Sequence, residues 1–501
     1  MTRPVSDHAE GRPEDWAAPG AALVRSAATD VVPPLADLGR VHIMGIAGSG
    51  MSALARILLE RGVPVSGCEA RDSITVSGLR AIGAQVHIGH ATEHVDACDT
   101  FVYTTAINPK HEEFAYARSS GKPVLRRAAA LACALEDKRT IAISGTHGKT
   151  STTSLLTVAA QACGIDPSFA IGGNLYETGK NAHLGTGDLA IVEADESDGS
   201  FLLTRPVAAV ITNVEADHLE NHGDLEGIFR AFEQFVDRID PSGFVLACAD
   251  DAGARRIADY ARGTGLRVIT YGEDAGADVV VSGIEPSGSG VRFTVASAHG
   301  GREVSVGSLI GGHMALNATA ALVMAGEFGL DLEVVLRTFA QFGGVHRRFE
   351  SHGTGGGVRV FDDYAHHPTE VAAQLSAAKG LLNGQERLIG VFQPGTYSRT
   401  QTFAREFADA MAIADIAVVM DIFPAREEPI PGVTGASISD LIDLPAEQVI
   451  YEPSYDKVPE RIAAVARPGD LVLTMGIGNV YLLCDEIRAA CSGALPEPAD
   501  S

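Results

Sequence analysis

The sequence predicts an α/β protein whose three domains are built on largely parallel sheets. Short apolar segments that end in glycine-rich or acidic turns alternate with amphipathic helical segments, which is typical of parallel strands joined by crossover helices. This strand–turn–helix pattern starts anew three times in 501 residues, and a domain usually takes about 100–200 residues. We therefore expect a flexible tail over residues 1–38 and domains over residues 39–137, 138–343 and 344–501.

The composition excludes several classes of partner. The chain has 39 Lys and Arg residues against 64 Asp and Glu residues, a net charge of −25, which repels nucleic-acid phosphates and anionic membrane surfaces. Seven cysteines are scattered without a C-x-x-C pair, which favours reduced thiols over a disulfide framework. The first residues lack the apolar core of a signal peptide, and no apolar run approaches the roughly 18 residues of a membrane span. We expect a cytoplasmic protein with no obligate protein partner.

The first domain opens on the strand Val41–Met44, which leads into the glycine-rich turn "GIAGSGM" and a helix. A second strand is expected over residues 63–68, and the alternation repeats in "AIGAQVHIGH" and "CDTFVYTTAI". A glycine-rich turn at a helix N-terminus is a typical site for a pyrophosphate group. Because Glu69 ends the second strand's segment, this loop alone also fits the dinucleotide site of a dehydrogenase.

The central domain opens on "IAISGTHGKT", in which a strand leads through a loop into a helix. Gly145 and Gly148 let backbone N–H groups turn toward a phosphate. Lys149 supplies a positive charge for the outer phosphates, and the hydroxyl of Thr150 suits Mg²⁺. The loop departs from a strict P-loop, which would have glycine in place of Ile143. We interpret it as a nucleotide-phosphate loop.

Two acidic segments follow the next strands of this domain. The first, "LAIVEADESD", ends in Glu193, Asp195, Glu196 and Asp198, and the second, "ITNVEADH", ends in His218. Because the carboxyl ends of parallel strands meet at one edge of a sheet, these groups are candidate ligands for a nucleotide-bound Mg²⁺. From about residue 243 to 309 the pattern is β-rich, and a helix is expected over residues 314–328.

The third domain has the strand patterns "VRVFDDY", "RLIGVFQ", "IAVVMDIF" and "LVLTMG". In "DDYAHHPTE", Asp363, His366 and His367 are candidates for deprotonating an amine, because imidazole titrates near neutral pH. Zinc is not expected there, since adjacent histidines point in different directions and no third ligand has a suitable spacing. Three arginines are candidates for bidentate contacts with a carboxylate or phosphate: Arg347, Arg348 and Arg399.

Six segments together resemble motifs of the Mur ligase family: "GTHGKTSTT", "EADESDGSF", "ITNVEADHL", "GGVHRRFE", "DDYAHHPTE" and "AREEPIPGVTG". The similarity covers about residues 39–490, in the expected order. It implies a Rossmann-like UDP-sugar domain, a central P-loop ATPase domain and a C-terminal Rossmann-like domain. It also implies an enzyme of cell-wall precursor synthesis that uses ATP and Mg²⁺ to join L-alanine to UDP-N-acetylmuramate through an acyl phosphate.

The resemblance also assigns roles to individual residues. It implies that the groups needed for catalysis are Lys149, Arg348, Asp363, His366 and His367. It implies nucleotide contacts by Gly145, Thr146, His147, Gly148, Lys149, Thr150, Ser151, His313 and Asn317. The metal ligands would be Thr150, Glu193 and His218. Contacts with the UDP-sugar or the amino acid would come from Gly45, Gly48, Ser49, Gly50, Met51, Thr105, Arg347 and Arg399, the last of these on the amino-acid carboxylate.

Several positions depart from the family pattern. Gly312 and Met314 stand in place of the arginine and asparagine of a signature that faces the nucleotide base. Gly395, next to Thr396, replaces a usual histidine, and Asn479 replaces a usual Gly-Asp pair. These last changes lie in the acceptor domain and leave two alternatives open. One is a paralogue with another amino-acid or peptide acceptor, such as a recycling ligase for a preformed tripeptide. The other is a non-catalytic paralogue that binds UDP-sugar and nucleotide.

Overall fold

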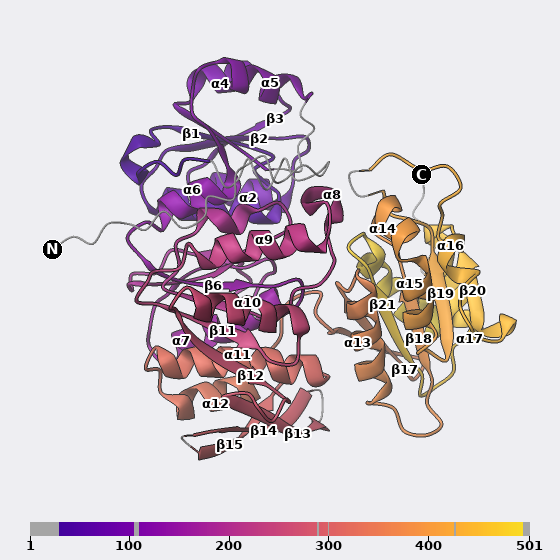
Figure 1. Cartoon of the computed structure of the whole chain (residues 1–501). Coiled ribbons are helices and arrows are strands. Elements are labelled where there is room, and N and C mark those ends of the chain that lie inside the picture. The colour runs from indigo at the N-terminus through magenta and orange to yellow at the C-terminus, as the bar shows by residue number, and fades with distance from the viewer. Residues whose placement is uncertain (1–29, 105–109, 288–289, 299, 425–426, 494–501) are drawn as a thin grey trace.

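The computed structural model describes residues 30–104, 110–287, 290–298, 300–424 and 427–493, which form three α/β units around separate sheets (Figure 1). One sheet lies within each of the three predicted domain ranges, so the predicted α/β fold class is confirmed. Most of the predicted tail lies outside the described residues. Its last part is described and includes the 3-10 turn η2 (Leu35–Asp37).

The first sheet has five parallel strands in the order β3-β2-β1-β4-β5. The strands are β1 (Val41–Met44), β2 (Val65–Glu69), β3 (Gln85–Ile88), β4 (Thr100–Tyr103) and β5 (Val124–Arg126). The helices are α2 (Ser49–Glu60), α3 (Ile74–Ala81), α4 (Glu93–Ala97), α5 (Glu112–Ser119) and α6 (Arg127–Ala134). Helices α4 and α5 cover one face of the sheet, and α2 and α6 cover the other (Figure 1). Because β1 lies between β2 and β4, a crevice is expected at its carboxyl end, where the glycine-rich turn lies.

The central sheet has ten strands in the order β15-β14-β13-β12-β11-β10-β6-β9-β7-β8. They are β6 (Arg139–Ser144), β7 (Ser168–Ala170), β8 (Ala182–His183), β9 (Leu189–Glu193), β10 (Ala208–Ile211), β11 (Phe244–Cys248), β12 (Arg267–Gly272), β13 (Val279–Ser287), β14 (Gly290–Ser297) and β15 (Gly300–Val306). The helices are α7 (Lys149–Ala162), α8 (Leu219–His222), α9 (Leu225–Val236), α10 (Ala252–Gly263), α11 (Gly312–Glu327) and α12 (Leu332–Ala340). Strand β6 lies between β10 and β9, so the phosphate loop that follows it occupies a second switch point.

The β-rich pattern expected over residues 243–309 was wrong in one respect, because helix α10 interrupts it. Its buried residues include Ala254, Ile257, Ala258 and Ala261. They recur at helical spacing, so the sequence carried a helical signal here that the β-rich interpretation passed over. Asp251 caps it by accepting hydrogen bonds from the backbone N–H groups of Ala254, at 2.6 Å, and Val214, at 3.0 Å.

The third sheet has the order β16-β17-β21-β18-β19-β20, with only the β16–β17 pair antiparallel. The strands are β16 (Glu350–Gly355), β17 (Val358–Asp363), β18 (Leu388–Phe392), β19 (Ile416–Met420), β20 (Val449–Glu452) and β21 (Leu471–Met475). The helices are α13 (Pro368–Lys379), α14 (Tyr397–Thr402), α15 (Ala404–Met411), α16 (Ala436–Ser439), α17 (Val458–Val465) and α18 (Cys484–Cys491). The strand patterns predicted for this unit are confirmed to within a residue or two at their starts.

The three units are joined in two different ways. One continuous hydrophobic core runs through the first and central units, with α2 packed against β7 and β8. The third sheet has its own cores on its two faces, and the unit stands beside the other two (Figure 1). Its contacts with the central unit near the phosphate loop are mainly polar, as described below. The third unit is therefore joined differently from the first, and its apolar contact with the central unit includes Ile310, which packs into the core on one face of the third sheet.

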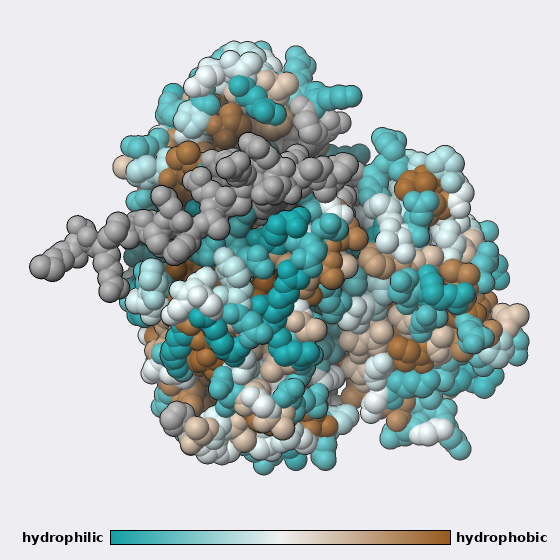
Figure 2. All heavy atoms as spheres, viewed as in Figure 1, coloured by the Kyte–Doolittle hydropathy of each residue, from teal (hydrophilic) through white to brown (hydrophobic). Residues whose placement is uncertain are grey.

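The surface agrees with the strongly acidic composition. On the face shown in Figure 2, hydrophilic residues dominate and hydrophobic residues form small separate patches. Among the described residues, the longest helices are too short or too polar to cross a membrane.

Candidate active site

A cavity of about 410 Å³ lies between the glycine-rich turn of the first unit and the acidic edge of the central sheet. From the first unit it is lined by the turn and the start of α2, together with Arg126 and Arg127 at the start of α6. From the central unit it is lined by Gly172 after β7 and by Glu193 and Asp195 at the end of β9. The cavity thus runs from the glycine-rich turn to Glu193, whose carboxylate contacts Thr150 at the start of α7.

Two glycines fix the shape of the phosphate loop. Gly145 has φ +133°, and a Cβ there would lie 2.0 Å from Oγ1 of Thr212. Gly148 has φ +84°, and a Cβ there would lie 2.4 Å from Oδ1 of Asn317. Neither position accepts a larger residue, because both the backbone angle and the space require glycine. The loop is therefore held against β10 and α11, with α7 beginning at Lys149.

The Lys149 ammonium lies among oxygen atoms at the base of this loop. Its Nζ donates to the carbonyls of Gly145, at 2.6 Å, and Thr146, at 3.1 Å. It also contacts both carboxylate oxygens of Glu196, at 2.8 and 3.0 Å. Burial lowers the pKa of Lys149, but Glu196, Asp195 and Glu193 raise it well above its usual value, so the ammonium stays charged. Burial raises the pKa of Glu196 to about 7, despite Lys149.

The expected metal ligands lie at the same edge. Oγ1 of Thr150 donates to the Glu193 carboxylate at 3.0 Å, and this carboxylate also accepts from the backbone N–H of Gly172 at 2.8 Å. His218 follows β10 in a left-handed conformation with φ +51°, and its Nε2 lies 3.5 Å from Oδ2 of Asp217. A hydroxyl beside a carboxylate is a hard oxygen pair of the kind that Mg²⁺ prefers, so Thr150 and Glu193 fit the expected ion.

Arg348 reaches this edge from the third unit. Its Nη2 lies 3.4 Å from Oγ1 of Thr150, and its guanidinium lies over the ring of Tyr364, 5.3 Å from the centroid. Arg347 is engaged differently, although it is the next residue. Its Nη2 donates to the carbonyl of Gly476 at 2.6 Å, and its Nε lies 3.2 Å from Oδ2 of Asp362. The structure therefore brings Arg348, rather than Arg347, to the phosphate loop.

His147 of the phosphate loop meets the third unit directly. Its Nδ1 lies 3.2 Å from Oε1 of Glu370 on α13, and its Nε2 lies 3.7 Å from Oε2 of Glu215. Burial lowers the pKa of His147, but Glu370 and Glu215 raise it to about 9 overall. The ring of His367 lies 4.9 Å from that of His147, between centroids.

Candidate ligand atoms of His147, Glu215 and His367 lie within 4.8 Å of one another, so the structure brings together partners for His367 that the sequence spacing did not show. The missing ligands come from another unit, where sequence spacing does not reveal them. Neither ring nitrogen of His367 has a hydrogen-bond partner in the described part of the chain, although the side chain is buried. Burial lowers its pKa, which favours neutral imidazole. His367 therefore places a buried, neutral imidazole at the interface of the two units.

The other two candidates of this loop hold its conformation. The Asp363 carboxylate accepts from the backbone N–H groups of Phe349 and Ala365, each at 2.8 Å, and burial raises its pKa to about 6. Nδ1 of His366 lies 3.0 Å from the carbonyl oxygen of Tyr364, and burial lowers the pKa of His366 to about 4. Both residues contact the backbone of their own unit.

Arg399 also crosses between units. Its Nη2 lies 2.7 Å from Oδ1 of Asp217, which follows β10, and both side chains are buried. Burial raises the pKa of Asp217, but His218 and Arg399 more than offset this and hold it well below its usual value. Nε2 of His313 lies 3.5 Å from Nε2 of Gln374 on α13, and burial lowers the pKa of His313 to about 4. Arg399 and His313 therefore both lie where the central and third units meet.

The structure shows which side chains surround the altered positions Gly395 and Asn479. A Cβ at Gly395 would lie 2.5 Å from Cγ1 of Ile477, so the Ile477 side chain occupies the space that a larger residue would need. The side-chain amide of Asn479 accepts from Nε2 of Gln393 at 3.3 Å. Thr396 caps α14, with its side chain accepting from the backbone N–H of Arg399.

Near the expected base site, Gly312 begins α11, and Met314 is buried with its Sδ 3.6 Å from Nδ2 of Asn317.

The remaining predicted substrate-binding residues that the structure describes lie at or near the cavity, and two arginines of the cavity were not predicted. Gly45, Gly48, Gly50 and Met51 line the cavity. Ser49 begins α2, whereas Thr105 lies outside the described residues; Ser151 is buried in α7. The sequence analysis missed Arg126 and Arg127, although the Arg-Arg pair before an alanine-rich helix was a visible signal. Nη1 of Arg126 donates to the carbonyl of Asp198 at 3.3 Å, so this arginine also links the first unit to the central one.

Three family descriptions match successive parts of the chain. The Mur ligase family catalytic domain matches residues 40–139, the Mur ligase middle domain matches residues 143–325, and the Mur ligase glutamate ligase domain matches residues 347–478. These stretches correspond to the three sheets.

Curated relatives and solved structures match over nearly the whole chain. The UDP-N-acetylmuramate–L-alanine ligase of Saccharopolyspora erythraea is 51% identical over 96% of this chain and 99% of its own. The ligase of the same name from Acidothermus cellulolyticus is 50% identical over 89% and 93%. The structure of UDP-N-acetylmuramate-alanine ligase from Thermotoga maritima has a TM-score of 0.75 at 25% identity, covering 89% of this chain and 98% of its own.

The pKa of His147 predicts a pH-dependent stability. Because this pKa is raised, to about 9, the protonated contact with Glu370 and Glu215 is fully stabilising below about pH 6.5 and is lost as the pH rises through 9. The free energy of unfolding of the wild-type protein should therefore fall between these pH values. In His147→Gln this fall should be smaller, by up to about 3 kcal/mol. Urea unfolding at pH 6.5 and 9.5 measures it, with His352→Gln as control. An unchanged difference in His147→Gln would contradict the assignment.

The fit of Ile477 against Gly395 predicts a compensating pair. Gly395→His should destabilise the protein by about 1–3 kcal/mol, because the new side chain overlaps Ile477. Adding Ile477→Ala should recover part of this loss, since it removes the overlapping atoms. Thermal and urea unfolding of the two single variants and the double variant measure the coupling. Strictly additive effects would show that the two positions do not compete for space.

Proposed function

The chain belongs to the Mur ligase family, and we propose that it is the ATP-dependent ligase that joins L-alanine to UDP-N-acetylmuramate. The observation that carries this proposal is the identity of about 50% with relatives named for that reaction, over nearly the full length of both chains. The reaction is the first peptide-forming step of cell-wall precursor synthesis.

The chemistry begins with a carboxylate, which is a poor electrophile until it is activated. Transfer of the γ-phosphoryl group from ATP to the sugar-linked carboxylate gives an acyl phosphate and ADP. Because both reactants are anions, this transfer needs positive charge around the moving group. Lys149 at the start of α7 and Arg348, 3.4 Å from Thr150, supply it from two sides. Mg²⁺ bound through Thr150 and Glu193 would add further charge neutralisation when present.

The cavity supports a UDP-sugar site that ends beside the phosphate loop, because its wall includes Glu193, which contacts Thr150. The UDP-sugar pyrophosphate would lie on the glycine-rich turn before α2, where backbone N–H groups and Arg127 face the cavity. Its carboxylate end would extend toward Glu193 and Asp195, beside the phosphate loop. This edge is strongly acidic and repels the substrate carboxylate. The carboxylate can come close only because the nearby arginines and the metal ion supply positive charge.

The amine of L-alanine would enter from the third unit. An ammonium is not a nucleophile, so it must lose a proton before it attacks the acyl phosphate; attack forms the amide and releases inorganic phosphate. His367 is buried, neutral and without a hydrogen-bond partner for either ring nitrogen among the described residues. We assign it as the proton acceptor, with His366 and Asp363 holding its loop. Arg399 would bind the carboxylate of the amino acid.

Phosphate release is the direct measure of this function. Purified protein with ATP, Mg²⁺ and UDP-N-acetylmuramate should release phosphate only when L-alanine is added, with a product of the matching mass. Lys149→Ala should lower turnover by at least about 10³-fold, because it removes the charge nearest the transferred group, while UDP-sugar binding is largely kept. Lys138→Ala is the matched control, since its Nζ contacts only the carbonyls of Gly185 and Gly187 in the described structure.

Other outcomes of this assay would replace the proposal. Release with another amino acid or with a tripeptide would identify a paralogue with a changed acceptor. ATP binding without release for any acceptor would indicate a non-catalytic protein. Full activity of Lys149→Ala would contradict the nucleotide assignment.

Arg399 tests the acceptor side separately. Arg399→Ala should raise the KM for L-alanine at least tenfold with a smaller effect on the KM for ATP, because it removes a guanidinium that pairs with the amino-acid carboxylate. Asp217→Asn serves as control, since it breaks the observed Arg399–Asp217 ion pair while leaving the arginine in place. An effect confined to ATP affinity, or an equal effect of Asp217→Asn on the L-alanine KM, would show that Arg399 only joins the two units.

A further inference from the structure

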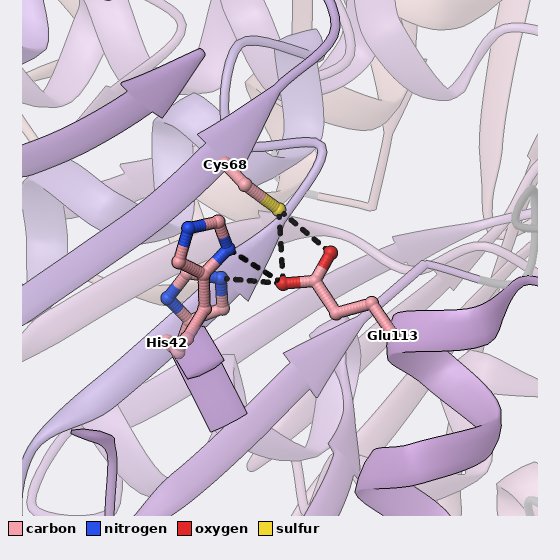
Figure 3. A group of neighbouring side chains, drawn as sticks. His42, Cys68 and Glu113 are labelled. Carbon is pink, nitrogen blue, oxygen red and sulfur yellow. Dashed lines mark hydrogen bonds and ion pairs between the residues drawn. The ribbon is translucent and has the colours of Figure 1, made fainter. Parts of the chain in front are cut away.

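A second group of chemically active side chains lies in the first unit, under helices α4 and α5. His42 on β1 and Cys68 on β2 project from adjacent strands toward Glu113 on α5 (Figure 3). His94 on α4 completes the group, which we call the His–Cys–Glu cluster. His42, Cys68 and Glu113 are at most 1% exposed, and the His94 side chain is 15% exposed. None of the four lines the substrate cavity.

The distances within this cluster are those of a metal-binding site. Sγ of Cys68 lies 3.2 Å from Oε2 of Glu113, and Oε1 of Glu113 lies 3.0 Å from Nδ1 of His94 and 3.3 Å from Nε2 of His42. One ligand atom from each of the four residues lies within 4.8 Å of the others. A tetrahedral zinc ion with bonds of about 2.0–2.3 Å separates its ligand atoms by about 3.3–3.8 Å, so small movements would complete this geometry.

The orientation of His42 also fits a metal ligand. Nε2 of His42 is buried and lies 3.3 Å from the Glu113 carboxylate, without the geometry of a good hydrogen bond. The other ring nitrogen, Nδ1, is held by Oγ of Ser66 at 3.0 Å. Histidines that bind a metal are typically oriented in this way, with one nitrogen on an outer partner and the other directed at the ion.

The charges of the cluster also match a cation. Burial raises the pKa of Glu113, but His42, Cys68 and His94 lower it to about 2 overall, so the carboxylate is ionised. Burial keeps His42 neutral by lowering its pKa, and burial and Glu113 raise the pKa of Cys68. A metal ion would displace the thiol proton to solvent as the metal–sulfur bond forms. Two anionic ligands, Cys68 and Glu113, then balance a divalent ion.

We propose that His42, Cys68, His94 and Glu113 form a closed structural site for Zn²⁺ that ties α4 and α5 to β1 and β2. Two imidazoles, one thiolate and one carboxylate are a donor set suited to zinc and poorly suited to Mg²⁺ or Ca²⁺. Four protein ligands leave no open position, which is the pattern of a structural rather than a catalytic ion. His90, with its Nδ1 3.1 Å from Sγ of Cys68, is placed to donate to the thiolate from outside the set.

A metal ion at this place would stabilise a weakly held part of the first unit. Helix α4 has five residues and α5 has eight, and such short helices are not stable by themselves. The hydrophobic cluster beneath them is small and separate from the main core, and it includes Cys68 itself. A metal crosslink between two strands and two helices would fix this layer to the sheet.

Cobalt provides the decisive test, because a thiolate bound to Co²⁺ gives a near-ultraviolet charge-transfer absorption and a tetrahedral site gives intense visible bands. Full-length protein treated with a chelator and dialysed should bind one equivalent of Co²⁺ with both signals, and Zn²⁺ should abolish them by displacement. Cys68→Ser should remove the charge-transfer absorption. Cys98→Ser, a buried cysteine of the same unit whose Sγ contacts only the carbonyl of Val95 in the described structure, should retain it.

Two further readouts keep the test decisive. His94→Asn should weaken Zn²⁺ binding at least tenfold, and it replaces the most exposed ligand if Cys68→Ser fails to fold by circular dichroism. Zn²⁺ should raise the Tm of the wild-type protein and not that of His94→Asn. The cluster of His147, Glu215 and His367 contains no cysteine, so cobalt bound there gives no charge-transfer absorption. Absence of that absorption in the wild type, or its persistence in Cys68→Ser, would overturn the proposal.

Discussion

The ammonium of Lys149 is the charge on which the arrangement of the active site depends. A buried ammonium must have counter-charges, and here it has two backbone carbonyls of the phosphate loop and the Glu196 carboxylate. Binding a nucleotide phosphate would give Lys149 a stronger partner. Glu196, whose pKa burial raises to about 7, could then take up a proton rather than remain as an uncompensated buried charge. In the described structure the Glu196 carboxylate is therefore the counter-charge that holds Lys149 in position.

The same edge of the central sheet is where the third unit docks. His147 with Glu370, Asp217 with Arg399 and Thr150 with Arg348 are all polar contacts between the two units. By contrast, the first and central units share a continuous apolar core. Polar contacts break at lower cost than an apolar core, because water replaces the lost partners. If the proposed function holds, docking of the third unit would also complete the active site, which suits a reaction whose intermediate must be kept from water.

The sequence predicts features whose residues lie close together along the chain, and it does not predict contacts between distant segments. The phosphate loop and the carboxylates after β9 were predicted because each lies within one strand–turn–helix segment. Contacts between distant segments were not, since Arg399 lies 182 residues from its partner Asp217 and no spacing links them. The same reason hid the His147–Glu215–His367 group and the His–Cys–Glu cluster, whose members come from separate strands and helices. Helix α10 was missed although its signal was local, because Ala254, Ile257, Ala258 and Ala261 recur at helical spacing between two strand patterns.

The structure gives a packing explanation for the altered motif position Gly395. Gly395 in place of a histidine would leave a gap, but the Ile477 side chain occupies that space from the adjoining loop. The change therefore exchanges one packed side chain for another and removes polarity without opening a hole. Meanwhile Lys149 keeps its charge and His367 keeps two free ring nitrogens in the described structure. The altered positions therefore leave the charge of Lys149 and the neutral imidazole of His367 in place, which is the arrangement that the proposed ligation needs.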